Sequence, residues 1–310
     1  MNKKRKFKIT GAAIAAALFF TVSVVSFTGC ENDETQTVAT LTNVTLAQEF
    51  DVDGPLDSAI WSFDIGDGSA EGIPGWGNNE LQYYTDRPEN VRIEDGVLKI
   101  TAIQEQFEGS GYTSGRIVTK AKFEQKYGRF EARMKLPWGQ GMWPAFWLLG
   151  SNREAVADND PNTLVWPFCG EIDIMENRGQ EPTLMNGTIH GPGYAGGDAI
   201  TKAHELENER FDTDFHIFGI EWGPGYINFY VDDVLYNQLT PADLPTGPEP
   251  EFLDEFLPGA EYDNLWNTWV YDQEFYIIIN LAVGGNYPGP PNENTVFPQT
   301  LEVDYVRVYQ

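Results

Sequence analysis

The amino-acid sequence predicts an all-β protein, an antiparallel β-sandwich of jelly-roll type with a concave cleft. Charged and apolar residues alternate through residues 129–136, which is the period of a strand with one buried face. The dipeptides Asp95-Gly96 and Asp232-Asp233 each separate two strand-like runs, as in two-residue hairpins. No segment has the pattern of an amphipathic helix longer than two turns, and 31 Gly and 19 Pro punctuate the chain.

Residues 1–29 have the pattern of an export signal. A positively charged start precedes an apolar run over residues 9–25, and a small-residue end, SFTGC, follows at residues 26–30. The apolar run is short for a transmembrane anchor and contains Thr and Ser. The cations of the start are Lys3, Lys4, Arg5, Lys6 and Lys8. We therefore expect an exported protein that has lost this segment.

The end of the signal resembles the lipobox of bacterial lipoproteins, in which the cysteine becomes the lipidated first residue. Thr28 and Gly29 precede Cys30, although Phe27 stands where Leu is usual. The acidic residues 31–34 resemble tails that send lipoproteins of some Gram-negative bacteria to the cell surface. These similarities imply a lipid anchor to the outer membrane or cell surface through Cys30 alone. Only Cys169 would remain as a thiol, so no disulfide is expected.

The remaining chain divides into a tether and one domain. Residues 30–45 are polar and Thr-rich without a period, which predicts a flexible tether. Residues 46–310 are expected to form the domain, with a nearly continuous apolar strand at 275–283 and a terminal strand at 301–309. The polar stretches 152–165 and 246–264 are expected to be surface loops inserted in this frame.

Composition and charge exclude some classes of partner. A net charge of −27 over 310 residues argues against nucleic acid and anionic membrane surfaces. The hydrophobic content of 41% supports a large core, and the chain is expected to act as a monomer. Nine Trp and 14 Tyr are numerous. Most of these would fill a β core, while exposed aromatic faces would suit the flat faces of sugar rings.

Three carboxylates within six residues distinguish the segment GEIDIMEN at residues 170–177. Glu171 and Asp173 share one face of a strand, whereas Glu176 would point to the other face. One extra residue in a β-bulge near Met175 would return Glu176 to the face of its partners. Close like charges do not favour folding. Glycoside hydrolysis, however, needs one ionised and one protonated carboxyl beside a single bond. The alternative is a strand with a solvated acidic face.

This segment resembles the catalytic signature of glycoside hydrolase family 16, in the bulged form of its laminarinase branch. The resemblance covers most of residues 46–310. Further matching motifs, in the right order, are GWGNNELQYYT (75–85), GQGMWPAFWLLG (139–150), GTIHGPG (187–193), NLAVGGN (280–286) and VDYVRVY (303–309). The resemblance implies a retaining hydrolase that cuts β-1,3-glucan such as laminarin internally, with no cofactor in catalysis.

The resemblance also implies roles for individual residues. Glu171 would be the nucleophile, Asp173 its assistant and Glu176 the general acid/base. Trp143 and Trp147 would line the cleft near the cleavage point, with core packing as the alternative for each. The residues expected to hydrogen-bond glucose hydroxyls are Asn79, Glu80 and Arg116.

His190 is one of only three histidines, and a lone histidine is ordinarily structural. Its place in a motif that matches the family cleft implies a contact with sugar instead. His204 and His216 keep the structural interpretation. The three histidines are not spaced for a zinc site.

Members of this family often hold a structural calcium on the face away from the cleft. The matching positions are Glu49, the Gly96 carbonyl and Asp304. Oxygen ligands suit calcium. The alternative is that Asp304 is only a solvated residue of the last strand.

Two departures from the family pattern leave the exact glucan open. Tyr287 stands where relatives often have Trp, and the segment 246–264 is longer than usual. A mixed-linkage β-glucan or an algal galactan is therefore an alternative substrate. A third hypothesis is a glucan-binding surface protein without catalysis, which the same fold can host. Such a protein would be expected to lose one or both glutamates, and both are present.

Overall fold

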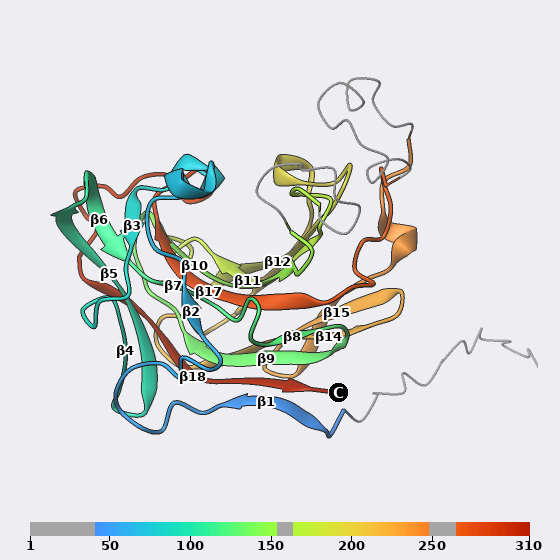
Figure 1. Cartoon of the computed structure of the whole chain (residues 1–310), viewed down its shortest axis with the longest axis horizontal. Helices are drawn as coiled ribbons and strands as arrows, with labels where there is room; N and C mark the ends of the chain where they lie inside the picture. The colour runs from blue at the N-terminus through green and yellow to red at the C-terminus, as the bar shows by residue number, and fades with distance from the viewer. Residues whose placement is uncertain (1–40, 154–163, 248–264) are drawn as a thin grey trace, which may run out of the picture. The chain divides into compact units, whose positions relative to one another are not determined.

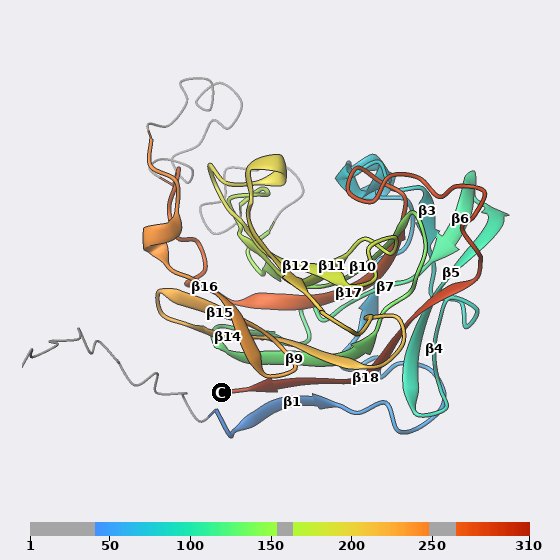
Figure 2. The ribbon, with the colours of Figure 1, turned by 180° about the vertical axis from the view of Figure 1, so that it is seen from behind.

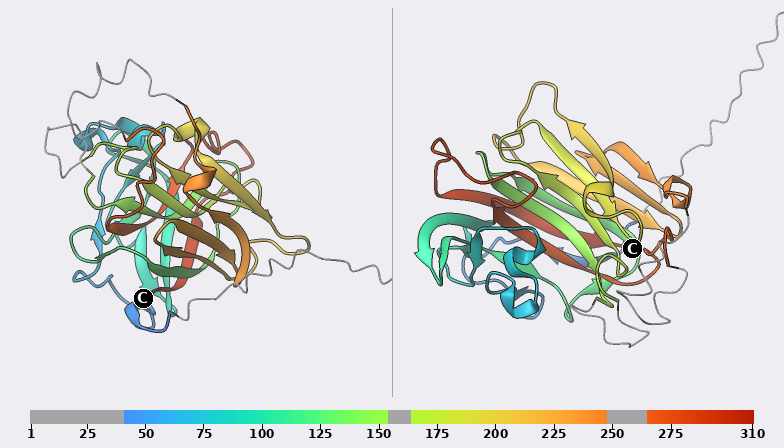
Figure 3. Two further views of the ribbon diagram at one scale, coloured as in Figure 1. Left: turned by 90° about the vertical axis from the view of Figure 1, so that its right-hand side faces the viewer. Right: turned by 90° about the horizontal axis from the view of Figure 1, so that it is seen from above.

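The structure, a computed structural model, describes residues 41–153, 164–247 and 265–310. The predicted signal peptide, Cys30, most of the tether and most of the two insertions therefore lie outside the described residues. Two large sheets lie face to face in Leu41–Gln310 (Figures 1 and 2). Figure 3 shows the same layers from the side and from above. No helix in the described ranges is long and apolar enough to cross a membrane.

The outer sheet has ten strands and includes one parallel pair, between β3 and β6. Its order is β16 (Val234–Leu239), β15 (Tyr226–Val231), β14 (His216–Gly223), β9 (Gly128–Lys135), β18 (Gln299–Tyr309), β5 (Val97–Phe107), β6 (Ser110–Ser114) and β3 (Gln82–Tyr84), with β1 (Val44–Gln48) beside β18 and β4 (Val91–Glu94) beside β5.

The inner sheet has eight strands and carries the cleft on its concave face. Its order is β13 (Ile200–Glu205), β12 (Leu184–His190), β11 (Glu171–Asn177), β10 (Met142–Gly150), β17 (Phe275–Val283), β7 (Arg116–Val118) and β2 (Ser62–Phe63), with β8 (Glu124–Gln125) beside β17.

Short 3₁₀ turns are the helical elements of the described chain. They are η1 (Ser69–Glu71), η2 (Pro74–Gly77), η3 (Gly196–Asp198) and η4 (Pro241–Asp243). The η1–η2 segment and η3 stand on opposite sides of the concave sheet (Figure 1). Residues of both η2 and η3 line the cleft, so these turns form two of its walls.

The sequence-predicted strands and hairpins are confirmed. The alternating residues 129–136 fall almost entirely in β9, which is central in the outer sheet. Asp95-Gly96 joins β4 to β5, and Asp232-Asp233 joins β15 to β16. All four turn residues have positive φ, as a type I′ turn requires. The jelly-roll prediction is therefore correct.

The hydrophobic core fills the space between the sheets. It includes alternating residues of β9 and of β17, a strand in which every residue is buried. A smaller cluster on the cleft side of the inner sheet contains Leu149, Cys169 and Ile278. Cys169 is a free, buried thiol, and burial raises its pKa to about 12. This thiol is therefore a packing residue.

The folded domain begins before residue 46, where the sequence placed its boundary. Val44 and Thr45, assigned to the tether, belong to β1. Val44 pairs with Tyr309 of β18, and Thr45 lies at the register shift that follows. Asn43 and Gln310 exchange backbone hydrogen bonds, so the first and last strands are joined at the ends of this unit. The polar composition of residues 43–45 concealed an edge strand whose one buried side chain is Leu46.

Candidate active site

Strand β11 carries the three acids and departs from regular pairing at the predicted position. In the ladder with β10, Asp173 and Met175 occupy consecutive pairing positions, so Ile174 has no partner there. Ile174 and Met175 both pack in the core. The strand then resumes its alternation, and Glu171, Asp173 and Glu176 all line the cleft. The predicted bulge is confirmed at Ile174–Met175.

The cleft has a volume of about 640 Å³ and crosses several strands of the inner sheet. Strand β10 shows how the sequence builds it. Its cleft-facing residues are Trp143, Ala145, Trp147 and Leu149. Its core-facing residues are Met142, Phe146 and Leu148. One strand therefore supplies both an aromatic cleft surface and a packed interior.

Each glutamate of β11 accepts a hydrogen bond from an indole. Trp143 Nε1 donates to Glu176 Oε1 at 2.9 Å. Trp166 Nε1 donates to Glu171 Oε2 at 3.0 Å. An indole can only donate, so each bond orients one carboxyl oxygen and favours its ionised form.

Asp173 lies deeper than the glutamates and is only 3% exposed. His190, at the end of β12, places its Nε2 3.1 Å from Asp173 Oδ2 and 3.7 Å from Glu171 Oε1. The Trp166 ring also contacts the His190 ring, at 5.8 Å between centroids. Strands β11 and β12 thus bring two carboxyls and one imidazole together.

Burial raises the pKa of each of Glu171, Asp173 and Glu176 to about 8. The negative charge of Asp173 adds to the effect of burial on both glutamates, whereas the two indole hydrogen bonds oppose it. The cleft therefore retains protons on some of these carboxyls at neutral pH. A retained proton and an ionised carboxylate on one strand are what combined acid and nucleophile chemistry requires.

A second polar cluster lies beside Trp147, on the β7 side of the cleft. The Arg116 guanidinium is sandwiched between two indoles, 4.4 Å from the Trp76 ring centroid and 5.0 Å from that of Trp147. Arg116 Nε also pairs with Asp64 Oδ2 at 2.9 Å. Trp147 Nε1 donates to Asn280 Oδ1 at 2.7 Å. These contacts fix the planes of both rings along the cleft.

A sequence profile described as glycosyl hydrolases family 16 matches residues 78–266. The chain belongs to this family. It is 40% identical over 266 residues to the beta-glucanase of Rhodothermus marinus, covering 85% of this chain and 84% of that one. It is 38% identical over 264 residues to the glucan endo-1,3-beta-glucosidase of Cryptopygus antarcticus, covering 80% and 85%. Its structure is similar to the laminarinase catalytic domain of Thermotoga maritima, with a TM-score of 0.72, 45% identity, and coverage of 86% and 98%.

Most predicted substrate-binding residues of this family 16 chain line the cleft. They are Glu80, Arg116, Trp143, Trp147 and His190. Asn79 is exposed, and its side chain donates at 2.9 Å to Oδ1 of Asn286, which lines the cleft. The neighbouring Asn78 also lines the cleft. A contact of Asn79 with sugar stays a prediction.

The carboxylate of Glu80 is hydrogen-bonded to neighbouring side chains of the protein. It accepts hydrogen bonds at Oε2 from Gln82 Nε2 at 2.7 Å and from Tyr84 Oη at 3.1 Å. Burial raises its pKa despite these bonds. Glu80 thus joins β3 to the cleft wall, and its contact with sugar stays a prediction.

Sequence reasoning missed Trp166, Asn186 and the cleft position of Trp76. Trp166 opens the segment that leads into β11, five residues before Glu171. That proximity was the available signal, but periodicity does not show where a residue outside a strand will point. Asn186 lies opposite Glu176 in the β11–β12 ladder. This pairing can be predicted only when the register shift at the bulge is known.

The other two histidines lie outside the cleft lining, in line with their structural interpretation. His216 Nδ1 is 2.7 Å from Asp232 Oδ2, and this partner raises the pKa of His216. His204 packs on the ring of Tyr236, 5.1 Å between centroids. His216 thus connects β14 to the β15–β16 turn, and His204 connects β13 of the inner sheet to β16 of the outer sheet.

The two carboxylates among the predicted calcium ligands have protein partners in the structure. Glu49 accepts two hydrogen bonds from Arg307, at 2.8 and 2.7 Å. Asp304 Oδ2 accepts one from Arg133 Nη1 at 2.8 Å. Calcium would have to displace a guanidinium from each carboxylate. In this arrangement the residues do not fit the ion, and the calcium site stays a prediction from the resemblance.

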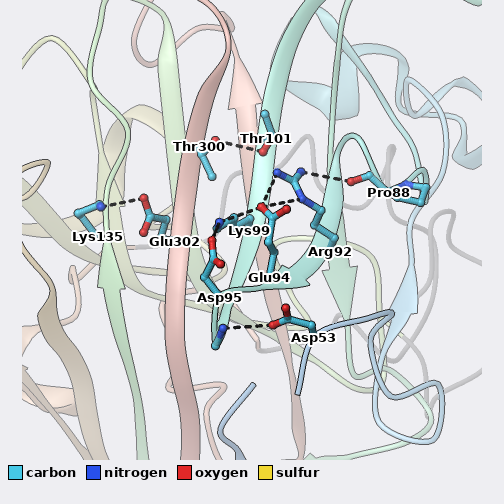
Figure 4. A network of polar contacts seen from close by, with 11 residues as sticks. Asp53, Pro88, Arg92, Glu94, Asp95, Lys99, Thr101, Lys135, Thr300 and Glu302 are labelled. Carbon is cyan, nitrogen blue, oxygen red and sulfur yellow. Dashed lines mark hydrogen bonds and ion pairs between the residues drawn. The ribbon is translucent and has the colours of Figure 1, made fainter. Parts of the chain in front are cut away.

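The third predicted ligand is the carbonyl of Gly96, in the turn between β4 and β5. Figure 4 shows the polar contacts of Glu94, Asp95 and Lys99 in this hairpin. The backbone N–H of Gly96 donates to Asp53 Oδ1 at 3.4 Å. From β5, Lys99 Nζ donates across the turn to Glu94, at the end of β4, and to Asp95, in the turn, each at 2.9 Å. The turn is therefore closed by ion pairs of this chain.

The raised pKa of Asp173 predicts how Asp173→Asn changes stability with pH. A carboxyl whose folded pKa exceeds its unfolded value stabilises the fold fully below about pH 4 and loses that contribution as pH rises towards 8. The variant should therefore match the wild type near pH 4 and melt on the order of a few degrees higher at pH 8. Melting temperatures across this range measure the difference. Asp198→Asn, at an exposed position in η3, is the control, and an equal gain there would contradict the explanation.

Proposed function

We propose that this family 16 chain is a retaining endo-β-1,3-glucanase that cleaves laminarin-type glucans. The observation that carries the proposal is the bulged strand β11, which directs Glu171 and Glu176 into one cleft with a separate indole donor on each. Relatives that align over most of this chain are named for β-1,3-glucan hydrolysis. The cleft is open along the sheet and has aromatic side chains in its lining, which suits internal cleavage of a long polymer.

In the first step, protonated Glu176 gives its proton to the glycosidic oxygen as the bond from that oxygen to C1 breaks. The carboxylate of Glu171 bonds to C1 from the opposite face and forms a glycosyl ester. In the second step, ionised Glu176 takes a proton from water while the water oxygen bonds to C1. As that bond forms, the ester bond from C1 to Glu171 breaks, and its electron pair returns to the carboxylate of Glu171. Two inversions at C1 retain the β configuration.

Asp173 assists by keeping the charge of the site low. It is buried beside Glu171, and two adjacent buried carboxylates would repel strongly. A proton held by Asp173 while Glu171 is ionised leaves one negative charge on the pair. That arrangement gives the nucleophile its charge without a second anion beside it.

Chemical rescue by azide tests the role of each glutamate separately. Glu171→Ala and Glu176→Ala should each lower kcat on an activated β-1,3-glucoside by on the order of 10²–10⁴-fold. Azide should rescue Glu171→Ala by attacking from the vacated face, which gives an α-glycosyl azide. In Glu176→Ala, azide should open the Glu171 ester and give the β-glycosyl azide. Product NMR distinguishes the two anomers.

The control for this rescue is Glu205→Ala on β13, outside the cleft lining, which should keep full activity. The opposite assignment of anomers would overturn the roles of the two glutamates. Product profiles on laminarin, lichenan and agarose then decide between β-1,3-glucan, mixed-linkage glucan and galactan as substrate.

We further propose that the protein is exported and lipid-anchored through Cys30. The cationic start, the apolar run and Thr28-Gly29-Cys30 support this proposal. Cys30→Ala should move the protein from the membrane fraction to the soluble fraction, because the acylated thiol would be its membrane attachment. Fractionation of cells measures this, with Cys169→Ser as the thiol control. Unchanged membrane partitioning of Cys30→Ala would rule out the lipid anchor.

A further inference from the structure

The imidazole of His190 has a backbone donor on one of its nitrogens. The Gly196 N–H donates to His190 Nδ1 at 3.1 Å. Gly196 starts η3 with φ +58°, a left-handed conformation that suits glycine. A nitrogen that accepts a hydrogen bond carries no hydrogen, so the neutral ring carries its hydrogen on Nε2.

The opposite nitrogen faces the carboxyls of β11. His190 Nε2 lies 3.1 Å from Asp173 Oδ2 and 3.7 Å from Glu171 Oε1. Asp173 Oδ2 is fully buried and has no hydrogen-bond partner in the described chain. A buried carboxyl oxygen without a donor is unfavourable, and an N–H at His190 Nε2, 3.1 Å away, is placed to supply one.

We propose that His190 is a positioning residue that acts as a neutral hydrogen-bond donor, with its tautomer set by the Gly196 amide. The inference deepens the proposed function and rests on Glu171 as the nucleophile. A neutral donor orients Asp173 and Glu171 without adding a positive charge beside them. The carboxylate of Glu171 therefore keeps its charge for the cationic sugar that forms at C1.

The tautomer also determines what this cluster can bind. Ligand atoms of Glu171, Asp173 and His190 lie within 4.8 Å of one another, as in a metal site. Tetrahedral zinc with bonds of about 2.0–2.1 Å would need ligands about 3.3 Å apart, close to the observed separations. However, a metal on Nε2 would force the hydrogen onto Nδ1, against the Gly196 N–H. Metal-bound histidines donate their second N–H to an acceptor. The cluster therefore favours a hydrogen on His190 Nε2 over a metal ion at that atom.

Nitrogen-15 NMR of the histidines in the full chain tests the tautomer without substrate. At neutral pH, His190 should show a protonated Nε2 and an unprotonated Nδ1, assigned by their loss in His190→Gln. Addition of zinc should leave these signals in place. A protonated Nδ1, a doubly protonated ring, or a zinc-induced shift of Nε2 would overturn the proposal. Because no turnover is measured, this outcome is independent of the proposed function.

Two replacements of His190 test the positioning role. A Gln amide can place an N–H near Nε2, whereas the shorter Asn amide reaches only the Nδ1 position. His190→Gln should keep kcat within about tenfold of the wild type, and His190→Asn should lose on the order of 10²-fold. KM should change little in either variant. His204→Gln is the control, because His204 lies outside the cleft lining.

Equal losses of kcat in the two variants would contradict the donor role. A rise in KM in both variants with kcat retained would assign His190 to sugar contact instead. Melting temperatures of both variants separate these outcomes from a loss of folding.

Discussion

The site depends on the bulge at Ile174–Met175 in strand β11. A regular strand would send Glu176 into the core, where an unpaired carboxyl is strongly unfavourable. The extra residue lets two consecutive apolar side chains pack inside and returns Glu176 to the cleft. The same packing that stabilises the sandwich therefore sets the distance between the two glutamates. Pairing on both sides, with β10 and β12, leaves the strand little freedom to slip.

Few groups of the cleft determine the ionisation of these three carboxyls. Burial raises all three pKa values, and each glutamate has one indole donor. The donors come from different segments. Trp143 lies on β10, the strand beside β11, and Trp166 lies in the connection that enters β11. A shared strand and separate donors allow two chemically similar side chains to perform different roles.

Local pattern predicted much of this arrangement. Alternation located β9, turn chemistry located two hairpins, and the spacing of Glu171, Asp173 and Glu176 required a bulge at the position where it is found. Contacts between distant segments were not predictable in this way. Trp166 reaches Glu171, and Gly196 reaches His190, through the paths of connecting segments that no periodicity describes.

The central claim is that Glu171 is the group that bonds to C1. An activated 2-deoxy-2-fluoro-laminaribioside slows hydrolysis of the glycosyl ester and allows its isolation. Peptide mass spectrometry after brief incubation should place one glycosyl group on Glu171, and Glu171→Gln should remain unlabelled. Attachment to Asp173 or Glu176 would contradict the account.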